Sequence, residues 1–329
     1  MRAIRVHTPG GPDALVVEDL PWPEPAAGEV RVHAEVIGVG RPDVLIRQGT
    51  YKWMPPLPAT PGAELVGLVD ALGAGVPPHL LGRRVLVSAR ELPQRGGCYA
   101  EAICVPATAP FLLPETIDPA DAASLPNVQL ALALLRAGGA MPVDSILVPG
   151  VSGGVGTALA QVARARGIRV IGSARSEAKR QFALAQGVES VVVTDPASLA
   201  TQVLALTGER GVDMAFDHLG GDWLTACLHA LAPMGMLVSY NAVLGPPARD
   251  SFREMRALLG RSLALRTFSM HTYDEWPAQR RALMDEAIAL LADGHLRLPA
   301  ATRLPLAEVR TAHVKLDAGD MLGKLVLVP

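Results

Sequence analysis

The chain has 329 residues, half of them hydrophobic and 19% charged, with a net charge of −2 at pH 7. This length favours two domains over a single core. The near-neutral charge provides no basic surface for a nucleic acid, and no apolar run approaches the ~20 residues that span a membrane. We therefore expect a globular protein that binds neither nucleic acid nor membrane.

The three cysteines, Cys98, Cys104 and Cys227, have no CxxC spacing. They predict neither a disulfide framework nor a cysteine-bound zinc lobe. Residues 1–6 have the pattern of a strand rather than of a signal peptide. Together these features predict a cytoplasmic protein with reduced thiols.

The chain from residue 1 to about residue 121 is β-rich and interrupted by proline and glycine. Residues 28–36 alternate polar and apolar side chains, which is typical of a strand with one buried face. Residues 64–72 and 83–87 continue this pattern. Short strands separated by turn residues indicate a compact, barrel-like β domain.

After Pro126 helices and strands alternate. The expected strands are the apolar run before Pro149 and residues 169–172, 190–193, 212–217, 236–239 and 262–268. Such alternation requires right-handed crossovers and a parallel sheet covered on both faces. A long helix at 276–292 and a strand at 323–328 follow. The sequence therefore predicts an α/β nucleotide-binding domain inserted into a first domain that the C-terminal segment completes.

A glycine-rich turn follows the first of these strands and opens an amphipathic helix, as in a dinucleotide-binding βαβ unit. Gly150 allows a sharp turn off the strand, and Gly156 lets the helix lie close to the sheet. The helix N-terminus would face a pyrophosphate with its free N–H groups. The expected cofactor contacts here are Gly150, Ser152, Gly153, Gly154, Val155 and Gly156. The alternative is a purely structural strand-to-helix turn.

The end of the second strand bears on the choice between NAD and NADP. NAD enzymes carry Asp or Glu about 20 residues beyond the glycines to bind the ribose 2′-hydroxyl, and this chain has Ala174 near that position. Arg175 and Lys179 can pair with a 2′-phosphate, and Ser173 or Ser176 can add a hydroxyl donor. The alternative is a capped helix start with solvated charges. We expect NADPH.

Several further motifs occur in a specific order. They are Met1-Arg2-Ala3-Ile4, the segment from Gly38-Val39 through Asp43 to Tyr51, Pro61-Gly62-Ala63-Glu64, Gly211-Val212-Asp213, Phe216-Asp217 with Gly220-Gly221, Ala312-His313, and Gly323-Lys324-Leu325-Val326-Leu327. Together with the glycine turn, they resemble the medium-chain dehydrogenase/reductase superfamily, and within it the zinc-independent, zeta-crystallin-like quinone oxidoreductase branch. The resemblance covers nearly the whole chain.

This resemblance implies an α/β protein with two domains and a cleft between them. The GroES-like substrate domain would comprise residues 1–122 and be completed by residues 269–329. The Rossmann domain, with a doubly wound parallel sheet, would comprise residues 123–268 and bind NADPH. The family often forms homodimers in which the last Rossmann strands, here residues 262–267, pair edge to edge.

Two positions argue against a catalytic zinc ion. Zinc-dependent relatives place a cysteine just after the Gly-Val pair and a histidine just before the glutamate, where this chain has Gly40 and Ala63. Neither side chain can ligate a metal. Because a simple alcohol or aldehyde is hard to polarise without a Lewis acid, we expect substrates that are already electrophilic, such as quinones, enones and enals.

Tyr51 is the expected catalytic residue, because it matches a tyrosine common in quinone reductases. Its phenol would hydrogen-bond the substrate carbonyl or supply a proton as hydride arrives. The alternative is an aromatic ring packed on Pro55, Pro56 and Pro58.

The expected substrate pocket is less polar than usual in the family. Gly40 stands where quinone reductases usually carry asparagine, and Leu45 where many carry a second tyrosine. Trp53 and Asn127 are the other expected pocket residues.

Strand ends at the carboxyl edge of the sheet should supply the remaining cofactor contacts. These are Leu219, Tyr240, Asn241, Phe268 and Ser269. His218 lies among them and is expected to be a wall residue rather than an acid or base.

The sequence therefore predicts an NADPH-dependent, zinc-independent reductase that transfers hydride to a quinone or other conjugated carbonyl. One alternative is a 2-enoyl-thioester reductase, which Tyr51 also supports. An alternative of another class is an NADPH-binding sensor or structural protein without turnover.

Overall fold

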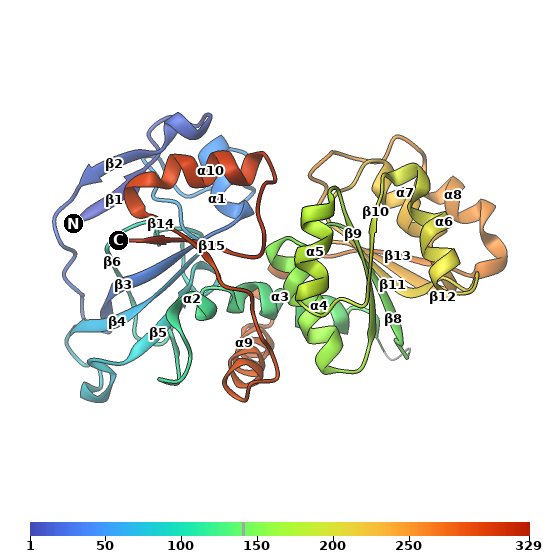
Figure 1. The fold of residues 1–329 in the computed structure, drawn as a ribbon. Coiled ribbons are helices and arrows are strands. Elements are labelled where there is room, and N and C mark those ends of the chain that lie inside the picture. The colour runs from blue at the N-terminus through green and yellow to red at the C-terminus, as the bar shows by residue number, and fades with distance from the viewer. Residues whose placement is uncertain (140–141) are drawn as a thin grey trace. The chain divides into compact units, whose positions relative to one another are not determined.

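The computed structural model describes residues 1–139 and 142–329. They form two compact units, one of Met1–Pro126 with Pro299–Pro329 and one of Asn127–Leu298. Figure 1 shows that each unit contains its own sheet and helices. The last residues of the chain belong to the first unit, so the second unit is inserted into the first along the sequence.

The main sheet of the first unit has the strand order β14-β15-β3-β4-β5-β7, and β6 pairs with β3. These strands are β3 (Glu29–Val39), β4 (Glu64–Leu72), β5 (Arg84–Ser88), β6 (Ala102–Pro106), β7 (Phe111–Leu112), β14 (Thr302–Pro305) and β15 (Leu325–Val328). The first residues of β3 alternate between buried and more exposed side chains, as their sequence predicts. Strand β15 lies between β14 and β3, so the C-terminal segment is part of the sheet.

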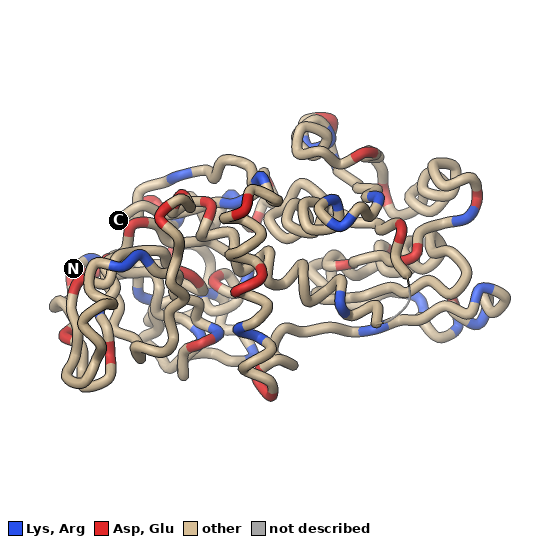
Figure 2. Tube along the Cα trace, turned by 90° about the horizontal axis from the view of Figure 1, so that it is seen from below, with Lys and Arg blue, Asp and Glu red and all other residues tan. Residues whose placement is uncertain are grey.

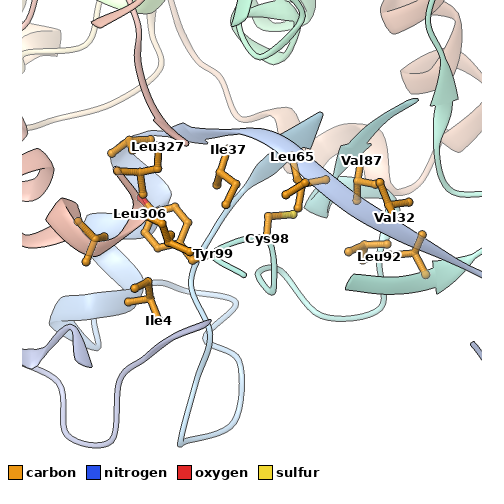
Figure 3. Packing of buried hydrophobic residues seen from close by; sticks show 14 of the residues in the cluster. Ile4, Val32, Ile37, Leu65, Val87, Leu92, Cys98, Tyr99, Leu306 and Leu327 are labelled. Carbon is orange, nitrogen blue, oxygen red and sulfur yellow. The ribbon is translucent and has the colours of Figure 1, made fainter. Parts of the chain in front are cut away.

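Smaller elements complete the first unit. They are the antiparallel pair β1 (Arg2–Arg5) and β2 (Val16–Asp19), and the helices α1 (Arg41–Gln48), α2 (Pro119–Ala122) and α10 (Val309–Asp317). The core gathers apolar side chains from both ends of the chain. In Figure 3, Leu306 and Leu327 of the C-terminal segment lie near Ile4, Ile37 and Tyr99. Burial of these side chains stabilises the unit only when both segments are present.

The second unit is built on a parallel sheet with the strand order β10-β9-β8-β11-β12-β13. The strands are β8 (Ser145–Val148), β9 (Arg169–Ala174), β10 (Ser190–Val193), β11 (Val212–Asp217), β12 (Leu231–Ser239) and β13 (Ala264–Thr267). The order reverses between β8 and β11, which is where doubly wound sheets open a crevice for ligands at their carboxyl edge. The predicted parallel sheet is thus confirmed.

The helices that alternate with these strands are α3 (Leu125–Arg136), α4 (Gly154–Ala165), α5 (Glu177–Ala185), α6 (Pro196–Leu206), α7 (Asp222–His229), α8 (Ser251–Ala257) and α9 (Pro277–Ala292). Helix α9 packs with the second unit, although the sequence assigned residues from 269 onward to the first domain. Gln129 Nε2 donates to the Arg280 carbonyl at 2.8 Å, and Arg166 Nη2 donates to Glu286 at 2.8 Å. The compact units therefore divide after 126 and after 298, not after 122 and 268.

Basic and acidic residues are mixed along the trace of both units (Figure 2). This distribution agrees with the small net charge of the chain. Within the described residues, the helices are all too short or too polar to cross a membrane.

Candidate dinucleotide-binding site

Two glycines at the turn between β8 and α4, Gly150 and Gly156, have no space for a side chain. Gly150 adopts φ +64°, in the left-handed region that disfavours other residues. A methyl group on Gly150 would come within 2.8 Å of His218 Cε1, and one on Gly156 would lie 2.8 Å from Val151 Cα. Both glycines are therefore required by close packing, as the sequence predicts for a dinucleotide turn.

Helix α4 begins without a capping side chain, because its N-cap is Gly153 in an extended conformation. Thr157 N donates to the Gly153 carbonyl at 2.8 Å, which starts the helical hydrogen bonds. The N–H groups of Gly154, Val155 and Gly156 precede that bond and lie at the positive end of the helix dipole. Ser152, just before the cap, is buried. This geometry suits an anion such as a pyrophosphate.

The end of β9 presents the residues that the sequence assigns to a 2′-phosphate. Ser173 is buried, and within the described part of the chain its hydroxyl has no hydrogen-bond partner. Arg175, the first residue after β9, is exposed. Ser176 caps α5 by accepting from Lys179 N at 3.4 Å, and its hydroxyl proton can still donate to a ligand. Ser173 and Arg175 thus lie on either side of the last residue of β9, and Lys179 lies in the first turn of α5.

The nearest acidic side chain at this strand end is Glu177, and it is occupied within its own helix. Its Oε1 accepts from Arg180 Nη1 at 2.8 Å and from Gln181 Nε2 at 2.6 Å. Ala174 ends β9 where NAD-binding proteins place an acid. The site is therefore better suited to a phosphate than to a ribose hydroxyl.

Beyond β11, a buried carboxylate shapes the next turn. Asp217 accepts from Leu219 N at 2.9 Å and from Gly220 N at 3.1 Å, and burial raises its pKa. Tyr240 N donates to the Asp217 carbonyl at 2.9 Å, and its ring lies 5.8 Å from that of His218. Leu219 and Tyr240 therefore lie near the glycine turn, at the carboxyl edge of neighbouring strands.

Three other predicted cofactor residues follow β12 and β13. Asn241 is exposed, and its Oδ1 accepts from Ala242 N at 2.9 Å. Phe268 N donates to the Ser239 carbonyl at 2.8 Å, and Ser269 caps the turn Met270–Asp274 by accepting from His271 N at 3.2 Å. Phe268 is held to the neighbouring strand end by a backbone hydrogen bond, whereas Asn241 and Ser269 bond within their own turns.

The predicted substrate residues of the first unit lie around α1. Gly40 precedes the helix, and the Leu45 carbonyl accepts from Tyr51 N at 3.2 Å. The rings of Tyr51 and Trp53 meet edge to face at 5.7 Å, and the Lys52 ammonium lies 5.3 Å from the Trp53 ring centre. Asn127 lies in α3 of the second unit.

Pro55, Pro56 and Pro58, the alternative packing partners for Tyr51, line a cavity of about 360 Å³ in the first unit. Tyr51 is absent from the lining of this cavity, which includes Ala3, Arg5 and Cys104.

A buried polar network behind α1 was not predicted. Asp43 accepts from Gly40 N at 2.8 Å and from Gly62 N at 3.0 Å, so one carboxylate fixes both segments. Burial and the nearby Glu64 raise the pKa of Asp43 to about 7. Glu64 itself forms a buried ion pair with Lys324 of the C-terminal segment.

The network extends to α10 through a neutral histidine. Arg47 Nη2 donates to Asp317 at 2.8 Å, and Arg47 Nη1 lies 3.3 Å from His313 Nδ1. Because a guanidinium can only donate, Nδ1 is the acceptor and Nε2 carries the proton toward the Tyr99 hydroxyl at 3.1 Å. Burial and Arg47 lower the pKa of His313 to about 4, which is consistent with this neutral form.

The sequence contained a signal for this network, since Asp43, Glu64, His313 and Lys324 all lie in the matched motifs. What it lacked was any indication that these distant positions meet. Within residues 1–139 and 142–329, no group of three or more His, Cys, Asp or Glu side chains is arranged to hold a metal ion.

Two family models match the chain, one in each unit. The model described as "Alcohol dehydrogenase GroES-like domain" matches residues 26–115, and that described as "Zinc-binding dehydrogenase" matches residues 154–286. Together with the sheet topology, they confirm the predicted α/β fold with a GroES-like and a Rossmann-type domain.

The chain is similar over its full length to proteins named quinone oxidoreductase. It is 30% identical to that of Rattus norvegicus over 334 residues, covering 100% of this chain and 98% of the relative. It is also 30% identical to that of Pseudomonas aeruginosa, covering 97% of each.

Solved structures of related proteins are also similar to this chain over its full length. The Escherichia coli quinone oxidoreductase in complex with NADPH is 28% identical, with a TM-score of 0.86 and full coverage of both chains. A mycobacterial protein in complex with NADPH is 30% identical, with a TM-score of 0.88 and full coverage of both chains.

Proposed function

Because this chain belongs to the quinone oxidoreductase branch of the medium-chain dehydrogenase/reductase superfamily, we propose that it reduces a quinone or other conjugated carbonyl with NADPH. The observation that carries this proposal is the glycine turn at Gly150–Gly156. It opens α4 next to the point where the strand order reverses, as a dinucleotide requires. The chain is accordingly an oxidoreductase.

The residues of the second unit fit NADPH. The uncapped start of α4 offers N–H groups to a pyrophosphate, and the unpartnered hydroxyl of Ser173 is available to a ligand group at the end of β9. Arg175 and Lys179 carry the positive charge that a 2′-phosphate requires. When bound, NADPH supplies the hydride, and the protein contributes orientation and exclusion of water.

Tyr51 is the proposed catalytic residue of the first unit. Its backbone is tied to the end of α1, and its ring is supported by Trp53. In this position its phenol would orient the substrate carbonyl or deliver a proton. Gly40, Leu45, Trp53 and Asn127 remain the proposed pocket residues.

We propose that the reaction proceeds without zinc. Gly40 and Ala63, which stand at the two metal-ligand positions of zinc-dependent relatives, carry no ligating group. Asp43, which holds both segments, already accepts two backbone N–H groups. Substrates that are electrophilic without a Lewis acid are therefore proposed.

A homodimer through β13 is also proposed. Among the described strands, β13 pairs with β12 alone, so its other edge is open to a partner strand. Light scattering of the purified chain tests this directly, since a monomer at micromolar concentration would contradict it.

One parallel assay tests the proposed activity. The purified protein is given NADPH with a naphthoquinone, an enal or crotonyl-CoA, and cofactor oxidation is followed by absorbance. The proposal expects fast turnover of the quinone or enal, and loss of most of it in Tyr51→Phe without loss of NADPH binding. A preference for crotonyl-CoA would favour the 2-enoyl-thioester reductase that Tyr51 also suits. NADPH binding without any oxidation would indicate a non-catalytic sensor.

A further inference from the structure

His218 lies at the carboxyl edge of the sheet, against the first glycine of the turn. It follows β11 directly, and β11 is paired with β8, the strand that leads to Gly150. A methyl group on Gly150 would lie 2.8 Å from His218 Cε1 and 3.3 Å from its Nε2. The imidazole thus occupies the space that Gly150 leaves open, between the two strands where the order reverses.

The two ring nitrogens of His218 have different surroundings. Nδ1 is buried, and in the described part of the chain it has no hydrogen-bond partner. Burial lowers the pKa of His218 to about 4, so the ring is neutral near pH 7 and carries one N–H. A buried N–H without an acceptor is rarer and costlier than a buried lone pair without a donor. The proton therefore resides on Nε2.

The Nε2–H group lies beside the turn that faces the pyrophosphate. A neutral donor there would bind a phosphate oxygen without depending on the protonation of the ring near pH 7. The preceding residue, Asp217, is not available for this purpose, since it accepts from Leu219 and Gly220. His218, the residue directly after β11, therefore places a hydrogen-bond donor beside the glycine turn.

We propose that His218 is a cofactor-binding residue whose Nε2–H donates a hydrogen bond to the pyrophosphate of the dinucleotide. This inference rests on the proposed binding of NADPH and goes beyond the wall role expected from the sequence. It assigns one side chain to a task that the glycine turn otherwise performs with backbone groups alone.

Two variants with amide side chains distinguish the roles of the two ring nitrogens of His218. In His218→Gln the amide nitrogen can occupy the position of Nε2, whereas in His218→Asn it occupies that of Nδ1. We expect His218→Gln to bind NADPH within about threefold of the wild type, and His218→Asn and His218→Leu to bind roughly tenfold or more weakly, the usual effect of losing a hydrogen bond to a charged group. Isothermal titration calorimetry measures these affinities without turnover.

A fragment and a stability measurement exclude a merely structural effect. Adenosine 2′-monophosphate has no pyrophosphate, so its affinity should be the same in all four proteins. Thermal unfolding without cofactor should likewise be similar. If His218→Leu does not fold, the comparison of His218→Gln with His218→Asn still tests the proposal.

Three outcomes would overturn the proposal. The three variants could equal the wild type, they could all lose affinity to the same extent, or the fragment could lose affinity in parallel with NADPH. A wild-type protein that binds no pyridine nucleotide would instead overturn the proposed function together with this inference.

Discussion

The backbone at Gly150 and the neighbouring ring of His218 leave no room for a side chain. In Gly150→Ala the alanine must adopt the left-handed backbone conformation of Gly150. Its methyl group would also lie within 2.8 Å of the His218 ring. We expect a loss of about 1–2 kcal/mol in the free energy of unfolding from backbone strain. We also expect NADPH affinity to fall roughly tenfold, because the turn and His218 must shift.

Gly167→Ala is the matched control for this variant. Gly167 follows α4 with φ +72°, but a methyl group there meets nothing within 4 Å. It should reproduce the loss of stability in denaturant unfolding and leave NADPH affinity unchanged in calorimetry. Equal loss of affinity in both variants would show that strain alone, rather than the site, is responsible.

Arg175 provides the second test at the scale of one residue. Arg175→Ala removes the guanidinium that we propose as a partner for the 2′-phosphate, a group that NADH lacks. We expect KM for NADPH to rise roughly tenfold and KM for NADH to change little, as measured by steady-state kinetics with both cofactors. Arg256→Ala, another exposed arginine of the second unit on α8, is the control and should change neither. An equal rise for both cofactors would remove Arg175 from this role.

Helix α1 depends on a carboxyl group whose protonation changes near neutral pH. Asp43 has a pKa of about 7 in the folded protein, above its ordinary value, because it is buried near Glu64. Between pH 4 and pH 7 the folded state holds a proton that the unfolded state has released, so this group makes stability fall as pH rises. Above the folded pKa the contribution is constant.

Asp43→Asn should therefore reduce the decline in stability between pH 4 and pH 7. Urea unfolding at a series of pH values measures this slope. The substitution also weakens one of the two backbone hydrogen bonds, so the variant should be less stable than the wild type at pH 4. Asp285→Asn, on the exposed side of α9, is the control and should retain the wild-type slope. If the free energy of unfolding of Asp43→Asn falls with pH as steeply as that of the wild type, another group causes the decline.

For the helices and strands, local sequence patterns were sufficient to predict much of the fold. The alternation in β3 and the glycine turn before α4 each depend on a few adjacent residues, and both were predicted. The contact of His313 with Tyr99 and the ion pair of Lys324 with Glu64 were not, because each joins positions more than 200 residues apart. Helix α9 was predicted as a helix, but its apolar face does not reveal which unit it covers.

For the whole molecule, the C-terminal segment is a structural requirement of the first unit. Leu327 on β15 is fully buried in that core, whereas Val314 on α10 is 54% exposed. We expect Leu327→Ala to cost roughly 2–5 kcal/mol in the free energy of unfolding of the first unit, because it leaves a cavity. Val314→Ala should change it by less than about 0.5 kcal/mol.

Amide hydrogen exchange tests which of the two units Leu327→Ala destabilises. In Leu327→Ala, amide protection should fall in β3, β4 and β5 and persist in β8, β9 and β11, since the two sheets belong to separate compact units. A uniform loss of protection across both sheets would show that the units unfold as one.

The position of β15 between β14 and β3 also has a consequence for biosynthesis. Residues 127–298 leave the ribosome as a complete set of strands and helices while β3 still lacks its last neighbour. The second unit can therefore mature during translation, whereas the first unit must wait for residues 299–329. Until they arrive, the nascent chain exposes an unpaired edge of β3.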